Sequence, residues 1–296
     1  MQFTVAIFSA VFRGIWAVLF KQANVLNKAG PWVNIFTGYN ILFVFGLLWL
    51  VFGWIRLPGE FFSWLLVVFF LIYNGIYLVM SPLEQLALRS EKLSSLQPYA
   101  NFSRIFAILC GFLLLGERNI VTFIVAIIAF LGTVIYATRG KQRRFSRGVL
   151  MYLASQILRG TLAVLAALLL TENDLVSFQM TGAEFASYEA LSMMMVLTVV
   201  FLGAWYMKLF KKSSWKYYAY RYGSCFVWDT GYLLWLFLVA DLGIITTSIL
   251  SLITIAVALI MGYFLFHDRP ERKDIGFAVL IVILICIGYV FKDVTI

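Results

Sequence analysis

Two arginines stand in the middle of apolar runs that would otherwise suit a membrane. Arg13 lies in SAVFRGIWAVL and Arg159 lies in SQILRGTLAVL, and the two stretches share a serine, the Arg-Gly pair and the closing Ala-Val-Leu. An arginine at the centre of a lipid-facing helix costs about 2.5–3.5 kcal/mol on insertion scales. The same costly residue in two matching stretches predicts a duplicated membrane protein in which each half turns an arginine toward a shared central cavity.

Anion recognition is the chemistry that these arginines favour. Arg104 is also central in its apolar segment, whereas Asp229 is the one central acid. A guanidinium without a carboxylate partner matches a planar carboxylate or phosphate, which it holds in a bidentate fork. We therefore expect a substrate with such a group between Arg13 and Arg159. The residues expected to line its site are Arg13, Trp16, Tyr77, Glu84, Tyr99, Arg104, Arg159, Glu189, Trp228 and Asp229.

A second interpretation places the same residues in structural roles. Arg13 or Arg159 would pair with Glu84, Glu189 or Asp229 and hold helices in register. Most deep aromatic rings would then pack in the core, and an aromatic site with Glu84 or Asp229 would bind a cation, quaternary amine or drug. A non-transporting membrane scaffold is the alternative of another class. Desolvated carboxyl groups can also carry protons, so proton coupling through Glu84, Glu184 or Glu189 competes with pairing.

The composition indicates a membrane protein with almost no mass outside the bilayer. Hydrophobic residues make up 63% of the chain and charged residues 12%, against about 45–50% and 25% in soluble domains. Ten apolar segments approach the span of about 20 residues that a bilayer requires. They cover residues 3–20, 32–55, 62–87, 93–115, 119–138, 148–170, 182–207, 217–239, 243–266 and 274–291. The basic residues lie between these segments, which argues against a nucleic-acid partner.

The second half of the chain repeats the first. GFLLLGER at residues 111–118 ends the fourth segment, and GYFLFHDR at residues 262–269 ends the ninth. The halves, 1–140 and 141–296, hold five segments each, and an odd number gives them opposite orientations. This is the inverted repeat of secondary transporters. We expect an all-α membrane protein with ten transmembrane helices in one integral unit.

Small residues and prolines in the segments have structural and functional interpretations. Gly14 and Gly160 directly follow the paired arginines, and small residues let neighbouring helices approach closely. Pro82 and Pro98 fall within the third and fourth segments, where each can kink a helix or mark a break at a binding site.

No constellation for catalysis is evident, and we expect no enzyme, cofactor or metal site. The single histidine, His267, lies at the end of a segment, which leaves no intramembrane Ser-His-Asp triad and no His-based zinc site. A Gly-rich phosphate loop is also lacking. The three cysteines fall inside apolar segments and are interpreted as free thiols.

The duplication and the run from Leu93 to Arg118 resemble the drug/metabolite transporter superfamily, in its ten-helix EamA-like branch. LSSLQP opens that run and LGER closes it, as in the family's fourth helix. The resemblance covers essentially the whole chain and implies transport by alternating access. Family substrates include amino acids, nucleotide sugars, organic phosphates, quaternary amines and drugs. Arg13 and Arg159 depart from the general family pattern.

The resemblance also implies cytoplasmic termini, whereas the loop charges favour the opposite. Lys and Arg gather in the loops after odd-numbered segments, and only Arg56, Arg118 and Lys292 lie in the others. Positive loops stay in the cytoplasm, which would put both termini outside. The expected partners are a small-molecule substrate and the lipid bilayer, with the protein a monomer or homodimer in the cell (inner) membrane.

Overall fold

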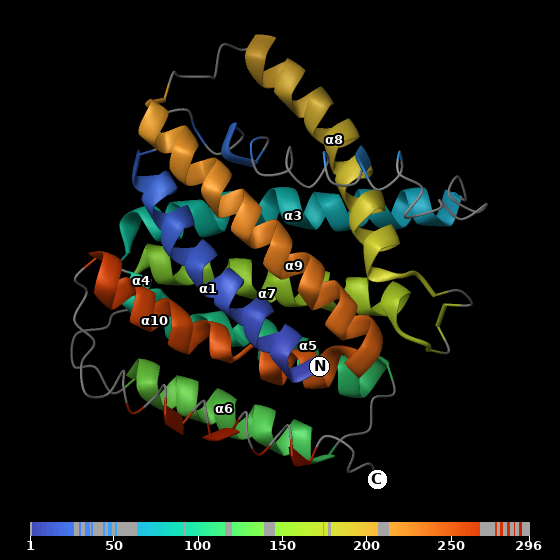
Figure 1. Cartoon of the computed structure of the whole chain (residues 1–296), viewed down its shortest axis with the longest axis vertical. Coiled ribbons are helices and arrows are strands. Elements are labelled where there is room, and N and C mark those ends of the chain that lie inside the picture. The colour runs from blue at the N-terminus through green and yellow to red at the C-terminus, as the bar shows by residue number, and fades with distance from the viewer. Residues whose placement is uncertain are drawn as a thin grey trace.

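The computed structural model of the chain is shown in Figure 1. It describes residues 2–26, 30, 33–35, 37, 44, 47–48, 51, 64–91, 93–115, 120–138, 146–173, 175–176, 179–206, 213–266, 276, 279–280, 283–284, 287 and 290–291. Most of the expected second and tenth segments, 32–55 and 274–291, lies outside the described residues.

The described chain is built from helices. The long ones are α1 (Gln2–Leu26), α3 (Trp64–Ser90), α6 (Ile120–Thr138), α7 (Arg147–Leu170), α8 (Gly182–Tyr206) and α9 (Trp215–Leu250). The short ones are α4 (Leu93–Leu96), the 3₁₀ turn η1 (Gln97–Ala100), α5 (Asn101–Leu114) and α10 (Ile253–Phe266). One isolated bridge between Asn173 and Val176 is the β-type pairing found in this part of the chain. The all-α prediction is therefore confirmed for the described residues.

Five helices in the described ranges are long and apolar enough to cross a membrane. They are α1, α3, α7, α9 and residues Gly182–Gly203 of α8. Their outward faces expose large apolar side chains, including Phe8, Leu71, Val199 and Phe226. An apolar surface of this extent is unfavourable in water and is typical of contact with lipid. The chain is thus a membrane protein.

Side-chain caps fix where three of these helices begin. Ser146 accepts the amide of Val149 at the start of α7, and Ser214 accepts that of Tyr217 at the start of α9. At α8 the Glu184 carboxylate accepts the Thr181 amide at 2.8 Å, and the Thr181 hydroxyl accepts the Glu184 amide at 3.2 Å. Each cap stabilises its helix by about 1 kcal/mol. Glu184, an expected proton carrier, thus has a structural task at a helix end.

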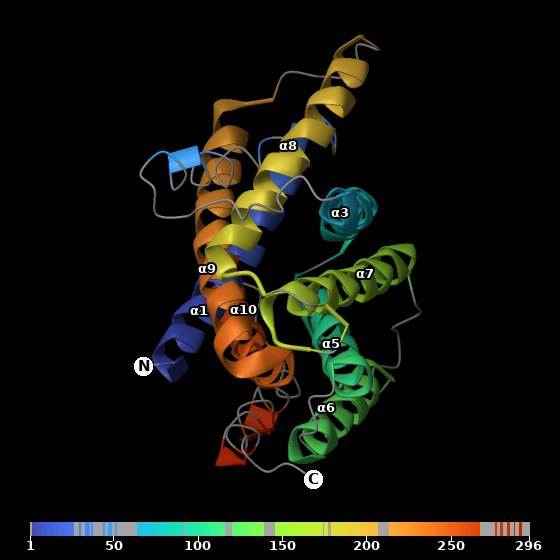
Figure 2. The same ribbon diagram turned by 90° about the vertical axis from the view of Figure 1, so that its right-hand side faces the viewer.

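Two groups of helices face each other across the core. Figure 2 shows α1, α8, α9 and α10 on one side and α3, α5, α6 and α7 on the other. Within the first group α1 packs along α9 and α10, and within the second α7 packs along α3 and α5. The two arginine-bearing helices therefore have matching neighbours, one pair in each group.

The glycines after the two arginines sit where helices touch. A Cβ on Gly14 would lie 2.5 Å from Cγ1 of Val257 on α10. A Cβ on Gly160 would lie 2.7 Å from the backbone oxygen of Ser103 on α5 and 2.9 Å from Phe106. Both separations are shorter than van der Waals contact, so only glycine allows these approaches, as the small-residue interpretation expected.

Alanine at Gly160 should therefore weaken the α5–α7 contact. The backbone oxygen of Ser103 cannot rotate away as a side chain can, and overpacking of this kind costs about 1–3 kcal/mol. The measurement is the thermal midpoint of the purified protein in detergent. Gly75→Ala is the matched control, because its Cβ would meet nothing within 4 Å. Equal midpoints for the two variants would contradict this packing.

The expected fourth and ninth segments are each interrupted. Pro98 had been interpreted as a kink or a site break in the fourth, whereas the ninth was expected to be one helix. In the fourth, α4 gives way to η1 at Gln97–Ala100 before α5 begins. Pro98 lies in η1, and a proline lacks an amide donor and disfavours helix in the residue before it.

The break in the ninth segment lies between Leu250, the last residue of α9, and Ile253, the first residue of α10. It is distinct from the kink at Gly243 (φ 74°), which marks the start of the ninth segment within α9. The Ser251 hydroxyl donates to the carbonyl of Thr247 at 2.8 Å, and the Thr254 amide donates to the carbonyl of Ser251 at 3.1 Å. Such local bonds compete with the regular helix ladder.

Candidate functional site

Three adjoining cavities lie between the helix groups. The arginine cavity is lined by Arg13, Arg104, Arg159, Glu84 and Thr254 among others, and has a volume of about 40 Å³. The acidic cavity, lined among others by Glu84, Glu189, Asp229, Arg159 and Arg221, is also about 40 Å³. The tyrosine cavity includes Tyr73, Tyr77, Tyr232 and Arg13 and is about 60 Å³. Arg159 and Trp228 line all three, so the cavities meet at these two side chains.

All of the expected site residues except Tyr99 line these cavities. The set comprises Arg13, Trp16, Tyr77, Glu84, Arg104, Arg159, Glu189, Trp228 and Asp229. Tyr99 lies instead in η1, buried in a separate apolar cluster, with its ring 6.4 Å from that of Phe102. The helix break turns Tyr99 into this cluster, which a continuous helix over 93–115 did not anticipate.

Arg159 is paired. Its Nη2 lies 2.5 Å from Oε2 of Glu84, a carboxylate whose side chain is only 5% exposed. The guanidinium carbon also lies 5.3 Å from the ring of Trp16 and 5.1 Å from that of Trp228, within cation–π range. The structural interpretation therefore holds for this arginine, whose positive charge is largely neutralised.

Arg13 differs from its counterpart. Its Nη1 donates to the Ser251 hydroxyl at 3.4 Å, a long hydrogen bond, and its buried Nε has no hydrogen-bond partner among the described residues. The guanidinium carbon lies 5.5 Å from the Trp228 ring and 5.8 Å from the Trp235 ring. Arg159 thus faces a carboxylate on α3, whereas Arg13 faces indole rings on α9. Arg13 therefore keeps an uncompensated charge within the described structure.

Arg104 is similarly short of acceptors. It is buried, its Nη1 donates to the carbonyl of Ala100 at 3.2 Å, and its Nε has no partner in the described structure. The buried hydroxyl of Thr254 also lacks a partner there. Arg13, Arg104 and Thr254 all line the arginine cavity. Buried donors without acceptors are rare in native proteins and call for a missing partner.

Both helix breaks border the arginine cavity. Ala100, the last residue of η1, and Thr254, in the first turn of α10, are among its lining residues. Two guanidiniums that form no ion pair with a carboxylate in the described structure give this cavity a positive character.

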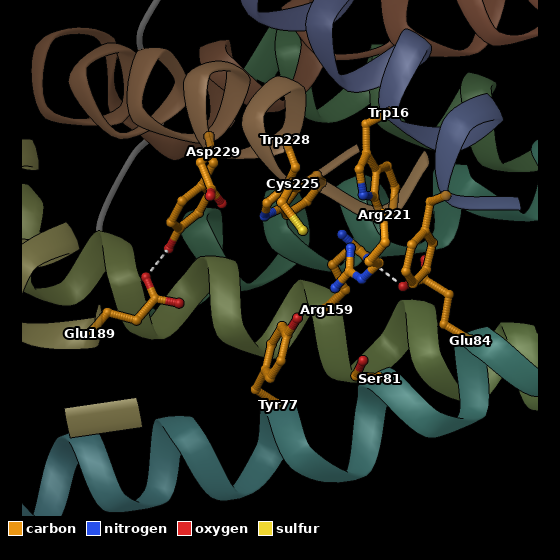
Figure 3. A pocket seen from close by; sticks show the side chains of 12 residues that line it. Trp16, Tyr77, Ser81, Glu84, Arg159, Glu189, Arg221, Cys225, Trp228 and Asp229 are labelled. Carbon is orange, nitrogen blue, oxygen red and sulfur yellow. Dashed lines mark hydrogen bonds and ion pairs between the residues drawn. The ribbon is translucent and has the colours of Figure 1, made fainter. Parts of the chain in front are cut away.

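The acidic cavity is lined by the carboxyl groups of Glu84, Glu189 and Asp229 beside two arginines (Figure 3). Asp229 is 3% exposed, and its buried Oδ2 has no hydrogen-bond partner among the described residues. Glu189 accepts the Tyr232 hydroxyl at 2.8 Å, and that hydroxyl lies 3.0 Å from the hydroxyl of Tyr73. The polar chain thus joins α8, α9 and α3 at one end of this cavity.

Arg221 also lines the acidic cavity, but its donors are occupied. Its Nε and Nη2 donate to the backbone oxygen of Asn34 at 2.9 and 2.6 Å, and Nη1 donates to the Ser224 hydroxyl at 3.2 Å. Its guanidinium carbon lies 4.9 Å from the Phe20 ring. Arg221 therefore ties the region before α3 to α9 and forms no ion pair with Asp229 in the described structure.

Trp228 was among the expected site residues, but the aromatic stripe that it forms on α9 with Tyr232 and Trp235 was not predicted. Trp228, Tyr232 and Trp235 stack in order with ring centroids 5.9 Å apart at each step. Their i, i+4, i+7 spacing places them on one helix face, and this signal was present in the sequence. Thr254 carried no comparable signal, because its contribution depends on the break before α10.

Comparison with known proteins gives a likeness in fold. No protein-family model matches the sequence, and no curated protein matches it. A solved structure described as "Crystal structure of protein" superposes with a TM-score of 0.63, covering 98% of this chain and 97% of that chain at 13% sequence identity. At this identity the likeness bears on the fold alone, and it extends over essentially the full length of both chains.

Proposed function

We propose that the chain is a ten-span secondary transporter of the drug/metabolite transporter type, which moves a small metabolite bearing a carboxylate or phosphate by alternating access. The observation that carries the proposal is the set of unpartnered donors on Arg13, Arg104 and Thr254 in one cavity. An anion supplies the acceptors that these groups lack, and guanidinium bonds to carboxylate or phosphate are among the strongest in proteins.

The packing supports two inverted repeats. α1 contacts α9 and α10 as α7 contacts α3 and α5, and the fourth and ninth segments of the duplication are both interrupted. Broken helices at corresponding places in two halves are typical of substrate sites in secondary transporters. Here both breaks border the cavity lined by Arg13 and Arg104, whose buried Nε donors have no partner in the described structure.

The candidate residues for proton coupling lie in the acidic cavity. Glu84 is paired with Arg159, and Glu184 caps α8. Glu189 and Asp229 are the remaining acids that line a cavity in the described structure. If one of them exchanges protons during the cycle, uphill uptake responds to an imposed pH gradient. Uptake that ignores the gradient would remove coupling from the proposal.

The substrate profile of the reconstituted protein tests the proposal against its alternatives. Proteoliposomes loaded with an unlabelled metabolite mixture would be assayed for counterflow of labelled amino acids, organic acids, phosphorylated metabolites and quaternary amines. We expect counterflow of at least one compound with a carboxylate or phosphate, above protein-free liposomes. Counterflow restricted to amines and drugs would favour the cation exporter, and no counterflow of any compound would favour the scaffold.

A further inference from the structure

We propose that the substrate is an elongated zwitterion, whose anionic group binds in the arginine cavity while its ammonium binds Asp229 in the acidic cavity. This inference rests on the proposed transport of an anion and adds a second pole to the same site. It is carried by a separate observation, the buried Oδ2 of Asp229, which has no hydrogen-bond partner among the described residues.

The two cavities differ in the ionisable groups that remain once the internal ion pair is set aside. The Arg159–Glu84 ion pair lies at the shared wall and contributes no net charge to either. The arginine cavity then retains Arg13 and Arg104, whereas the acidic cavity retains Asp229 and Glu189 against Arg221. Since Arg221 donates to Asn34 and Ser224, no described cation hydrogen-bonds the carboxylate of Asp229.

The surroundings of Asp229 suit an ammonium. A primary ammonium has three donors and no acceptor, so it can bond Asp229 and leave donors for a second oxygen in the same cavity. A buried carboxylate without such a partner is costly, and a bound ammonium relieves that cost.

The two poles lie in different cavities, which bears on the shape of the substrate. Asp229 lines the acidic cavity, Arg13 lines the other two, and Trp228 stands where all three meet. Figure 3 shows Asp229 on one side of the pocket and the Arg159–Glu84 pair on the other, with Trp228 and Cys225 between them. An α-amino acid has one carbon between its charges, whereas the proposed substrate has several carbons between the ammonium and the anionic group, so that each group enters a different cavity.

A homologous series of compounds tests this inference. The purified protein would be titrated with ω-amino acids from glycine to 6-aminohexanoate, and with the alkanoates and alkylamines of equal length, using the ligand-induced rise in thermal midpoint. We expect the wild type to bind the longer ω-amino acids at least tenfold more tightly than the matching alkanoates and than glycine. Asp229→Asn should lose this preference and retain alkanoate binding. Asp241→Asn, the same change at an exposed site on α9, should behave as the wild type.

Each other outcome overturns the inference. Equal binding of alkanoates and ω-amino acids by the wild type would remove the ammonium subsite and leave the proposed anion transport standing. A preference retained in Asp229→Asn would do the same. Binding of alkylamines alone would defeat both proposals, and binding of none of the series would reject the elongated zwitterion. If Asp229→Asn fails to fold, as shown by its ligand-free midpoint, the wild-type series alone decides.

Discussion

Replacing Glu84 with glutamine should lower the free energy of unfolding by about 3–5 kcal/mol, the typical result of removing one partner from a buried ion pair. The change leaves the Arg159 guanidinium with the rings of Trp16 and Trp228 but without its carboxylate. This side chain is 15% exposed, so water replaces little of the lost interaction. The measurement is reversible unfolding of the purified protein in mixed micelles titrated with denaturing detergent.

A double-mutant cycle separates the ion pair from general damage. Glu84→Gln with Arg159→Gln should be more stable than the sum of the single losses predicts, because neither variant side chain leaves a buried charge. Asp241→Asn provides an exposed acid on α9 as the control and should change stability by less than about 0.5 kcal/mol. Additive losses in the double variant would show that Arg159 and Glu84 do not interact.

Glutamine at Arg13 or Arg104 should weaken binding of the anionic substrate by about 10–100-fold each. The reason is the loss of a charge-assisted hydrogen bond, worth about 1.5–3 kcal/mol. Arg13→Lys should also bind more weakly than the wild type, because lysine keeps the charge and cannot offer the planar fork. The readout is the half-saturating concentration in counterflow, measured with the compound that the wild type transports best.

Stability should move little in these two variants, which separates them from Glu84→Gln. Arg13 and Arg104 carry buried donors without acceptors, so their removal leaves no new unpaired group in the described structure. Arg147→Gln is the matched control, an exposed arginine at the start of α7. Unchanged half-saturation in both cavity variants would assign the two arginines to structure alone.

The sequence was sufficient to predict which helices matter and that their arginines share a centre. The paired Arg-Gly stretches identified α1 and α7, and the structure places Arg13 and Arg159 against the same Trp228 ring. The reason is energetic: a charge inside an apolar helix has few tolerable surroundings, so its location is strongly constrained. The all-helical fold was predicted separately, from the length and apolar composition of the segments.

The difference between the two arginines could not be predicted from their matching sequences. It depends on which residue of the neighbouring helix faces each guanidinium, Glu84 on α3 or the indoles of Trp228 and Trp235 on α9. The role of Arg221 was equally hidden, because its acceptor is a backbone oxygen at Asn34, distant in sequence. Every residue has a backbone carbonyl, so the amino-acid sequence does not show which carbonyl accepts a given hydrogen bond.

The break in the ninth segment was not predicted, and the form of the break in the fourth segment was not predicted either. Pro98 was noted as a kink or a site break, but its position did not reveal that four residues would adopt a 3₁₀ turn and bury Tyr99 elsewhere. At the second break the Ser251 and Thr254 bonds end one helix and begin another. Serine and threonine occur within many membrane helices, so their presence alone does not indicate an interruption.

The most direct test of an anion site between Arg13 and Arg104 is the location of a bound anion. Crystals soaked with selenate, a tetrahedral oxyanion that carries an anomalous scatterer and does not alkylate thiols, would show where an anion binds. The account predicts a selenium peak in the arginine cavity, with selenate oxygens within hydrogen-bonding distance of the guanidiniums of Arg13 and Arg104. A cavity without anomalous signal while selenate occupies other sites would contradict it.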